Sequence, residues 1–287
     1  MSAAARGEYA RANAMNPTLL ACLLLPLAFA PKHAPAPAPT ATTAVFAFDQ
    51  THTSWKLVLD GRVFSGRFDY GSLVKDPSPL DRYLAELTGV EYADFSTWKK
   101  EEQLAFWINA YNAFTVKRVL QSYPFEKVNE LGADKKGPWD ERFIPLGRLA
   151  PDLKEAKLTL NELENKLLRP KFKDARVHAA INCAAESCPP LRPAPYTAEG
   201  LGGQLDAQVM KWLNNVDYNQ FDPQKKTMKL SALFDWYAKD FSEEAGSVQA
   251  WIVKHGPKPV VGWLDGAKDV TTTYAEYSWK LNVKKGD

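Results

Sequence analysis

The stretch that most constrains the fold is 96–123, STWKKEEQLAFWINAYNAFTVKRVLQSY. Apolar residues recur along one face at helical spacing, and further apolar residues fill most of the remaining circumference. A helix that is apolar nearly all round is buried and does not lie on a surface. We therefore predict a long helix at the centre of the domain, ended by Pro124. The residues of its main apolar face are Leu104, Trp107, Ile108, Tyr111, Thr115 and Val119.

Shorter helices are predicted after this segment. Thr159 and Glu162 have the spacing of a capping box, which predicts a short helix that closes before Pro170. Apolar residues at helical spacing predict a further helix over 198–214. Ser231 is expected to cap a helix over 232–241, and another short helix over 247–255 is expected to stop at Gly256.

Three segments are predicted as strands. The stretch 176–183, RVHAAINC, alternates between apolar and other residues, as a half-buried strand does. Residues 219–231 are predicted as a hairpin that turns at Asp222 and Pro223, and 269–283 is rich in β-branched and aromatic residues. Together these patterns predict an α+β fold: a helix-rich single domain with a buried central helix and a small, mainly antiparallel sheet.

The N-terminus has the pattern of an export signal. Residues 17–30 form an apolar run that is too short to span a bilayer comfortably, and Ala28-Phe29-Ala30 fits a cleavage site. We expect a signal peptide over 1–30, a Pro/Ala-rich linker over 31–44 and one globular domain over 45–287. The mature protein is then secreted or periplasmic, with no stable membrane span.

Charge gives no reason to expect nucleic acid as a partner. The chain has 36 basic and 34 acidic residues. Residues 1–44 hold three of the basic residues and one of the acidic ones, so 33 of each remain in the expected domain. A balanced charge attracts neither a nucleic acid nor an anionic membrane. A small-molecule or peptide partner is left, and no pattern predicts a cofactor.

Two amides lie on the otherwise apolar central helix. Asn109 and Asn112 are three residues apart, so their side chains project from neighbouring positions. A buried amide must find hydrogen-bond partners or cost about 1–3 kcal/mol. The two amides are therefore expected to hold a loop backbone, a water molecule or a ligand, and anchoring a loop is the commoner role.

The stretch with the most reactive side chains is 178–192, HAAINCAAESCPPLR. His178 and Cys183 form a candidate base and nucleophile, because an imidazole can take the thiol proton and the thiolate can attack an acyl carbon. On a strand they would face opposite sides, so the chain would have to turn between them to bring them together. Asn182 shares a face with His178, and it could orient the imidazole or donate to a developing oxyanion.

Other interpretations of the same stretch stay open. Cys183 and Cys188 are suitably placed for a disulfide in an exported protein, and such a bridge could also be a reversible redox couple. His178 could be a hydrogen-bonded core residue. A metal site is disfavoured, because His178, Cys183 and Cys188 give three ligands where structural zinc needs four.

Four segments in order resemble the domain of unknown function 547 family over roughly 80–282. They are AFWINAYNAFTV (105–116), VHAAINCAAESCPPL (177–191), KLSALFDWYAKDF (229–241) and YAEYSWKLN (274–282). The family occurs in exported bacterial proteins, and its activity is not settled. Its pattern falls on Trp107, Asn109, Tyr111 and Asn112, and on His178, Asn182, Cys183, Ser187, Cys188, Pro189 and Pro190. Ala184 departs from the glycine that the family often has there.

Two functions are therefore weighed. The first is a thiol-dependent hydrolase or transferase that acts on an amide or thioester, with Cys183 as nucleophile, His178 as base and Asn182 as a positioning group. Trp107, Asn109, Tyr111 and Asn112 would contact the substrate, and Cys188 would be an alternative thiol. The second is a non-catalytic binding or scaffold module with a Cys183–Cys188 disulfide. Glu102, Asp174 and Glu186 are equal candidates for an acidic third member.

Overall fold

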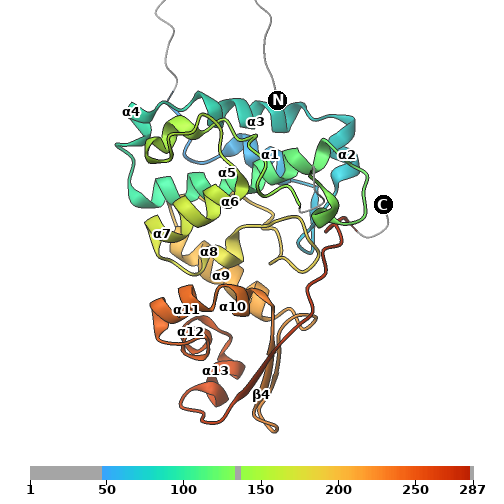
Figure 1. Cartoon of the computed structure of the whole chain (residues 1–287), viewed down its shortest axis with the longest axis vertical. Coiled ribbons are helices and arrows are strands. Elements are labelled where there is room, and N and C mark those ends of the chain that lie inside the picture. Colours follow the sequence, from blue (N-terminus) through green and yellow to red (C-terminus); the bar gives the residue numbers. More distant parts are fainter. Residues whose placement is uncertain (1–46, 133–136, 285–287) are drawn as a thin grey trace, which may run out of the picture. The chain divides into compact units, whose positions relative to one another are not determined.

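The computed structural model describes residues 47–132 and 137–284, so the expected signal peptide, the linker and Val45 lie outside the described residues. The predicted long helix, α5 (Lys100–Leu120), is buried over most of its length. Figure 1 shows it among the helices of the upper half of the view. The Glu102 carboxylate accepts the Lys99 backbone N–H at 2.7 Å. Acidic residues in the first turn and basic residues in the last turn complement the helix dipole.

The first half of the domain packs around α5. The α2 and α3 helices contact α5, and α1 contacts α3. Its elements are α1 (Thr53–Leu59), β1 (Val63–Phe64), β2 (Arg67–Phe68), α2 (Tyr70–Lys75), α3 (Ser78–Gly89), α4 (Tyr92–Phe95) and the 3₁₀ turns η1 (Val128–Glu130), η2 (Gly147–Leu149) and η3 (Pro151–Leu153). These elements bury their apolar residues in one core with α5.

The second half begins with a helix of mixed geometry and ends in a three-stranded sheet. Its elements are α6 (Leu160–Glu162), the π-helical η4 (Leu163–Leu168), α7 (Arg169–Phe172), α8 (Val177–Ala180), α9 (Leu201–Leu213), β3 (Gln220–Asp222), β4 (Thr227–Leu230), α10 (Leu233–Trp236), α11 (Ala238–Ala245), α12 (Val248–His255), α13 (Lys258–Leu264) and β5 (Thr271–Tyr274). A second buried cluster includes residues of α9, β4 and α10–α13.

The strands confirm the predicted class of fold. β3 pairs with β4 in antiparallel fashion, as the predicted hairpin requires, and β1 pairs with β2 in the same way. β5 adds to β4 in parallel, with Thr227 opposite Thr271. The described residues thus form a helix-rich α+β fold with two small sheets.

The C-terminal segment returns from β5 to the first core. Figure 1 shows it, in dark red, running from the β4 region back toward the helices around α5. Isolated bridges join Lys280 to Lys127, Leu281 to Ala185 and Val283 to Phe68. The predicted strand over 269–283 is therefore regular only at Thr271–Tyr274. Its remainder brings aromatic side chains beside the cysteine-containing loop.

Two local predictions are wrong. The helix that starts with the Thr159–Glu162 capping box does not close before Pro170, because it widens into the π-helical η4 and continues through the proline as α7. Wider turns accommodate a ring that lacks an N–H and crowds the preceding carbonyls. The stretch 176–183 is no strand: Val177–Ala180 forms one helical turn, in which alanine is favourable, and Ile181 is extended.

The predicted helix over 232–241 is interrupted. The α10 helix ends at Trp236, and α11 begins at Ala238 after a break at Tyr237. The N-cap of α10 is Ala232 and not the predicted Ser231, whose hydroxyl makes only a long contact of 3.4 Å with the Leu233 N–H. The break turns Tyr237 toward the loop that carries the cysteines, where it lines a pocket.

Candidate functional site

A small pocket of about 120 Å³ is lined by residues from both ends of the segment 178–188. Its lining includes His178, Cys183 and Cys188, so the turn after α8 brings together residues that a strand would have separated. The remaining walls come from α5, α6, η4, α10 and the C-terminal segment. They are Tyr111, Trp139, Asn161, Glu164, Ile181, Pro189, Leu233, Trp236, Tyr237, Tyr277 and Trp279.

His178 is held firmly on one side of this pocket. Its imidazole Nε2 lies 2.8 Å from Oδ2 of Asp240 in α11, and only 2% of the residue is exposed. The ring stacks on Tyr237, with 4.2 Å between ring centroids. Arg169 donates to the other Asp240 oxygen at 2.9 Å and fixes the carboxylate.

These contacts determine which imidazole nitrogen is free to accept a proton. Burial alone would raise the pKa of Asp240, but hydrogen bonds from His178 and Arg169 outweigh it and lower that pKa well below its usual range. The ionised carboxylate accepts only, so Nε2 of His178 must donate. In a neutral imidazole Nδ1 is then the acceptor. No hydrogen bond to Nδ1 is found among the described residues, so Nδ1 is the nitrogen that could accept a proton.

Cys183 and Cys188 are joined in a disulfide, with their Cα atoms 6.3 Å apart. The Cys183 N–H lies 3.0 Å from the Cys188 sulfur. The hydroxyl of Tyr277 lies 3.3 Å from each sulfur, and it is the donor in the bridged form because neither sulfur carries hydrogen. Cys183 is partly exposed, whereas Cys188 is only 7% exposed.

The turn after Cys183 has the geometry that favours glycine. Ala184 has a φ of 68°, in the left-handed region, and its N–H is bonded to the Asn182 side chain at 2.8 Å. Alanine adopts this conformation at a cost that glycine avoids. The sharp turn is therefore retained despite the departure from the family pattern.

A buried carboxylate forms another wall of the pocket. Glu164 lies in the π-helical η4 and is 6% exposed. Burial raises the pKa of Tyr111 and of Tyr237, and the charge of Glu164 and a hydrogen bond with its side chain raise both further. Both phenols therefore stay protonated and act as donors toward Glu164. π-helical segments recur at functional sites, which adds weight to this position.

Four aromatic side chains pack on one another around the pocket. Trp236 and Tyr277 have ring centroids 4.8 Å apart, Tyr277 and Trp279 4.5 Å, and Trp139 and Trp279 5.1 Å. Trp236 is 49% exposed. These four residues, Trp139, Trp236, Tyr277 and Trp279, are called the aromatic rim below.

The two helix amides anchor backbone. Asn109 donates to the Tyr196 carbonyl at 2.7 Å and accepts the Tyr196 N–H at 3.0 Å. Asn112 donates to the Ala180 carbonyl at 3.0 Å and accepts the Asn182 N–H at 2.8 Å. The second pair holds α8 and the start of the cysteine loop against α5. Each amide thus uses both its oxygen and its nitrogen on the protein backbone.

Of the other predicted site residues, some line the pocket and some do not. Tyr111 lines it, whereas Trp107 is fully buried in the core of α5 and does not. Asn182 also lies outside it. Its side chain bonds to the Pro189 carbonyl at 2.8 Å and accepts from Asn282 at 3.0 Å.

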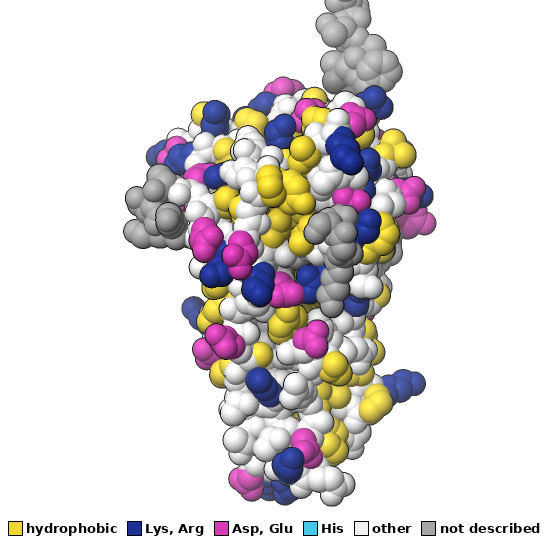
Figure 2. All heavy atoms as spheres, turned by 90° about the vertical axis from the view of Figure 1, so that its right-hand side faces the viewer, with side chains coloured by type: hydrophobic (Ala, Val, Ile, Leu, Met, Phe, Trp, Pro, Cys, Tyr) yellow, Lys and Arg dark blue, Asp and Glu magenta, His cyan; other side chains and the backbone are white. Residues whose placement is uncertain are grey.

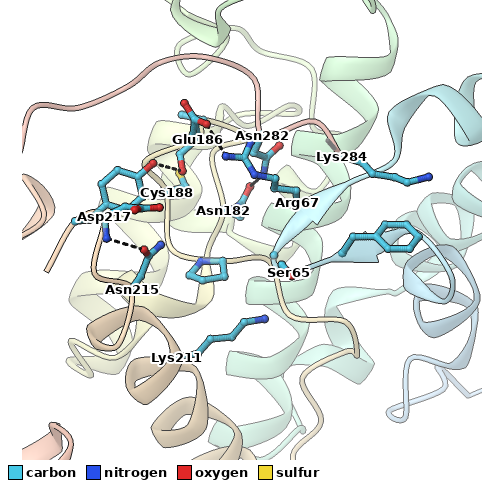
Figure 3. Close-up of a pocket in the computed structure, with 15 residues that line it drawn as sticks. Ser65, Arg67, Asn182, Glu186, Cys188, Lys211, Asn215, Asp217, Asn282 and Lys284 are labelled. Carbon is cyan, nitrogen blue, oxygen red and sulfur yellow. Dashed lines mark hydrogen bonds and ion pairs between the residues drawn. The ribbon is translucent and has the colours of Figure 1, made fainter. Parts of the chain in front are cut away.

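Asn182 lines a second cavity of about 550 Å³, shown in Figure 3. Arg67, Glu186 and Lys211 also line it, and Arg67 pairs with Glu186 there. Cys188 contributes to the lining of both cavities. The disulfide loop therefore separates the small pocket with His178 from this larger, polar one.

None of the three acidic candidates from the sequence contacts His178. Glu102 caps α5, Asp174 pairs with Arg176 at 2.7 Å, and Glu186 pairs with Arg67. The acidic partner of His178 is Asp240, which was not predicted from the sequence. Asp240 lies within a segment of the family resemblance, WYAKDF, and that position was the available signal.

The described residues contain no group of three or more His, Cys, Asp or Glu that could hold a metal ion. Within the same ranges, no helix is long and apolar enough to cross a membrane. The site is therefore built from a disulfide, an imidazole–carboxylate pair, a buried carboxylate and aromatic rings.

Fold and site together define a helix-rich α+β domain with a small pocket lined by a disulfide and by a histidine that is hydrogen-bonded to Asp240. Residues 95–213 match the family model described as "Protein of unknown function, DUF547", which confirms the predicted resemblance over that segment of the chain. The match covers α5, η4, α8 and the cysteine loop, and it ends with α9. No curated protein and no solved structure matches the chain.

Proposed function

We propose that this protein is a thiol-dependent hydrolase or transferase that acts on an amide or thioester, and that the Cys183–Cys188 disulfide is its resting form. One observation carries the proposal. His178 lines the same small pocket as both sulfurs, with Nε2 committed to Asp240 and Nδ1 left as an acceptor. A base oriented by a carboxylate beside a thiol is the arrangement that nucleophilic catalysis by cysteine needs.

Reduction comes first. A small thiol or dithiol supplies two electrons and two protons, becomes a disulfide itself and releases Cys183 and Cys188 as thiols. Cys183 is the better nucleophile, because it is partly exposed and Cys188 is buried. The Tyr277 hydroxyl, 3.3 Å from the Cys183 sulfur, is placed to donate to its thiolate.

Acyl transfer then follows in two steps. Nδ1 of His178 takes the proton of Cys183, and the thiolate attacks the carbonyl carbon. A carbon–sulfur bond forms as the bond to the amine or thiol leaving group breaks, and the leaving group receives the proton from His178. Water or a second nucleophile next attacks the acyl-enzyme, and Cys183 recovers its proton.

The test is the alkylation of the reduced protein by iodoacetamide between pH 5 and 9, with the modified cysteine mapped by mass spectrometry. We expect Cys183 to react faster than Cys188 and to stay reactive below pH 7, whereas an ordinary thiol has a pKa of about 8.5. His178→Gln should remove the advantage, and His255→Gln, which changes a histidine bonded to Glu244, should not. Equal reactivity of both cysteines, with the pH profile of the unfolded chain, would overturn the proposal.

A second candidate is favoured by the disulfide itself: a non-catalytic binding or scaffold module in which the bridge fixes the loop. The bridge closes a ring of few residues, and Cys188 is buried in the core. Under this function the bridge resists mild reductant, and neither thiol shows enhanced reactivity after forced reduction.

We also propose that the protein is exported, secreted or periplasmic, as its N-terminal pattern predicts. A disulfide is suited to an oxidising compartment, which supports this location. Charge gives no support for a nucleic-acid partner, because basic and acidic side chains are interspersed on the face shown in Figure 2. Cell fractionation of a tagged full-length chain tests the location, and recovery from the cytosol would contradict it.

A further inference from the structure

The site pocket combines a buried anion with aromatic walls. Glu164 is 6% exposed, and none of the ion pairs among the described residues includes it. The charge of Glu164 acts on the guanidinium of Arg169. The pKa of Arg169 is raised first by its hydrogen bonds to Asp240 and only then by Glu164. That guanidinium is committed to Asp240 and Asn165.

The local charges therefore sum to a negative value when His178 is neutral. Glu164 and Asp240 contribute two negative charges, and Arg169 contributes one positive charge. A buried carboxylate without its own cation is costly, and a cationic group that enters the pocket would offset that cost. The Tyr111 and Tyr237 phenols hydrogen-bond to the Glu164 carboxylate, but they carry no positive charge that would balance it.

The aromatic rim provides the second half of a cation site. The faces of tryptophan and tyrosine attract ammonium groups, and aromatic cages bind methylated and quaternary ammonium ligands. Trp139, Trp236, Tyr277 and Trp279 line the same pocket as Glu164. Tyr237 is not counted among these walls, because Arg169 and His178 already lie against its ring.

The size of the pocket sets the size of the group. Its volume of about 120 Å³ holds one small head group and lies well below the roughly 300–1,000 Å³ of pockets for drug-sized ligands. A phosphate or carboxylate is disfavoured by Glu164, and a neutral alkyl group would leave that carboxylate buried and unpaired.

We propose that this pocket recognises an organic ammonium group, with Glu164 as the counter-ion and the aromatic rim as the cage. The inference rests on the proposed function for the role of the pocket. It adds the substrate class, which is an amide or thioester that carries a protonated amine or a quaternary ammonium. Glu164 acts as a specificity-determining residue.

The test is calorimetric titration of the full-length oxidised protein with four probes. Choline and butylammonium represent the two kinds of cation, and 3,3-dimethyl-1-butanol and 1-butanol are their neutral counterparts. We expect a cation to bind at least about tenfold more tightly than its neutral counterpart. The cation that binds more tightly identifies a quaternary or a primary ammonium as the natural group. Equal binding of cations and alcohols, or no binding of either cation, would overturn the inference.

Variants locate the effect in the pocket. Glu164→Gln keeps the shape and removes the charge, and it should abolish the preference for cations. Trp236→Ala should weaken cation binding several-fold. The matched controls are Glu243→Gln and Tyr92→Ala, which change an exposed acid and an exposed aromatic residue outside the pocket. If Glu164→Gln fails to fold, the comparison of probes on the unmodified protein still decides.

This experiment fails independently of the proposed function, because the bridged protein has no free thiol at Cys183. Cation binding without enhanced thiol reactivity would keep the ammonium site and reject the enzyme. Enhanced thiol reactivity without cation binding would keep the enzyme and reject the ammonium site.

Discussion

The His178 imidazole and the Asp240 carboxylate meet at 2.8 Å, although 62 residues separate them in the chain. Asp240 is brought there by α11, after the break at Tyr237. The same break places the Tyr237 ring against the imidazole, so one irregular position supplies both the partner and the stacking face.

Replacing Asp240 with asparagine tests this pair. The amide can donate to Nε2, which would move the imidazole proton to Nδ1 and remove the free base. We expect Asp240→Asn to slow alkylation of Cys183 in the reduced protein about tenfold or more near neutral pH. Asp235→Asn, at an exposed position of α10, is the control. A rate equal to that of the unmodified protein would show that Asp240 does not orient the base.

The disulfide makes a separate prediction about stability. Removing it frees a short loop in the unfolded state, which costs about 2 kcal/mol in the chain-entropy model. Cys183→Ser, Cys188→Ser and the double variant should each lower the free energy of unfolding by a similar amount in urea titrations under oxidising conditions. Additive losses in the double variant would mean that the two sulfurs stabilise the fold separately and not as one bridge.

A close backbone approach fixes the other side of the cysteine loop. Gly66 has a φ of 85°, and a Cβ built there would lie 2.3 Å from the Cβ of Pro190. Gly61 has a similar φ of 67° but open space around its Cβ position. Gly66→Ala should therefore destabilise more than Gly61→Ala, by about 1–3 kcal/mol, since only the first forces the loop to move. An equal loss of thermal stability in the two variants would contradict the close contact between Gly66 and Pro190.

The lowered pKa of the Glu244 carboxyl should make the stability of the fold depend on pH. Burial alone would raise the pKa of Glu244, but hydrogen bonds from Lys254 and His255 outweigh it and lower the pKa to about 2 from 4.5. A carboxyl with a lowered pKa stabilises the fold above its unfolded-state pKa, and this stability is lost as the pH falls through the folded-state value.

The free energy of unfolding of the unmodified protein should exceed that of Glu244→Gln by about 1 kcal/mol above pH 5, after allowance for solvent screening. The difference should decrease steadily as the pH falls from about 4.5 to 2. Urea titrations across this range provide the measurement, with the exposed Glu243→Gln as control. A difference that is as large at pH 2 as at pH 5 would reject the role of the Glu244 charge.

The sequence predicted what depends on long periodic patterns. The central helix follows from apolar residues on nearly every side of 100–120, and the capping box at Thr159 and the hairpin at Asp222 follow from local hydrogen-bonding chemistry. These features are decided by neighbours along the chain, so a single sequence contains the information.

The site depended on contacts that no local pattern encodes. The alternation in 176–183 was too short to separate a strand from one helical turn of alanines. Asp240 and Glu164 reach the pocket through a helix break and a π-helical segment, and both irregularities result from tertiary packing. Cys183 and His178 were identified from their chemistry, but their shared pocket became evident only in three dimensions.

The central claim is that reduced Cys183 is an acyl-accepting nucleophile. The most direct measurement is mass spectrometry of the full-length protein after brief exposure to p-nitrophenyl acetate, with and without prior reduction by dithiothreitol and its removal. We expect an acetyl group on Cys183 in the reduced protein, none in the bridged protein, and much less in reduced His178→Gln. Acetylation of Cys183 no faster than in the urea-unfolded chain would contradict it.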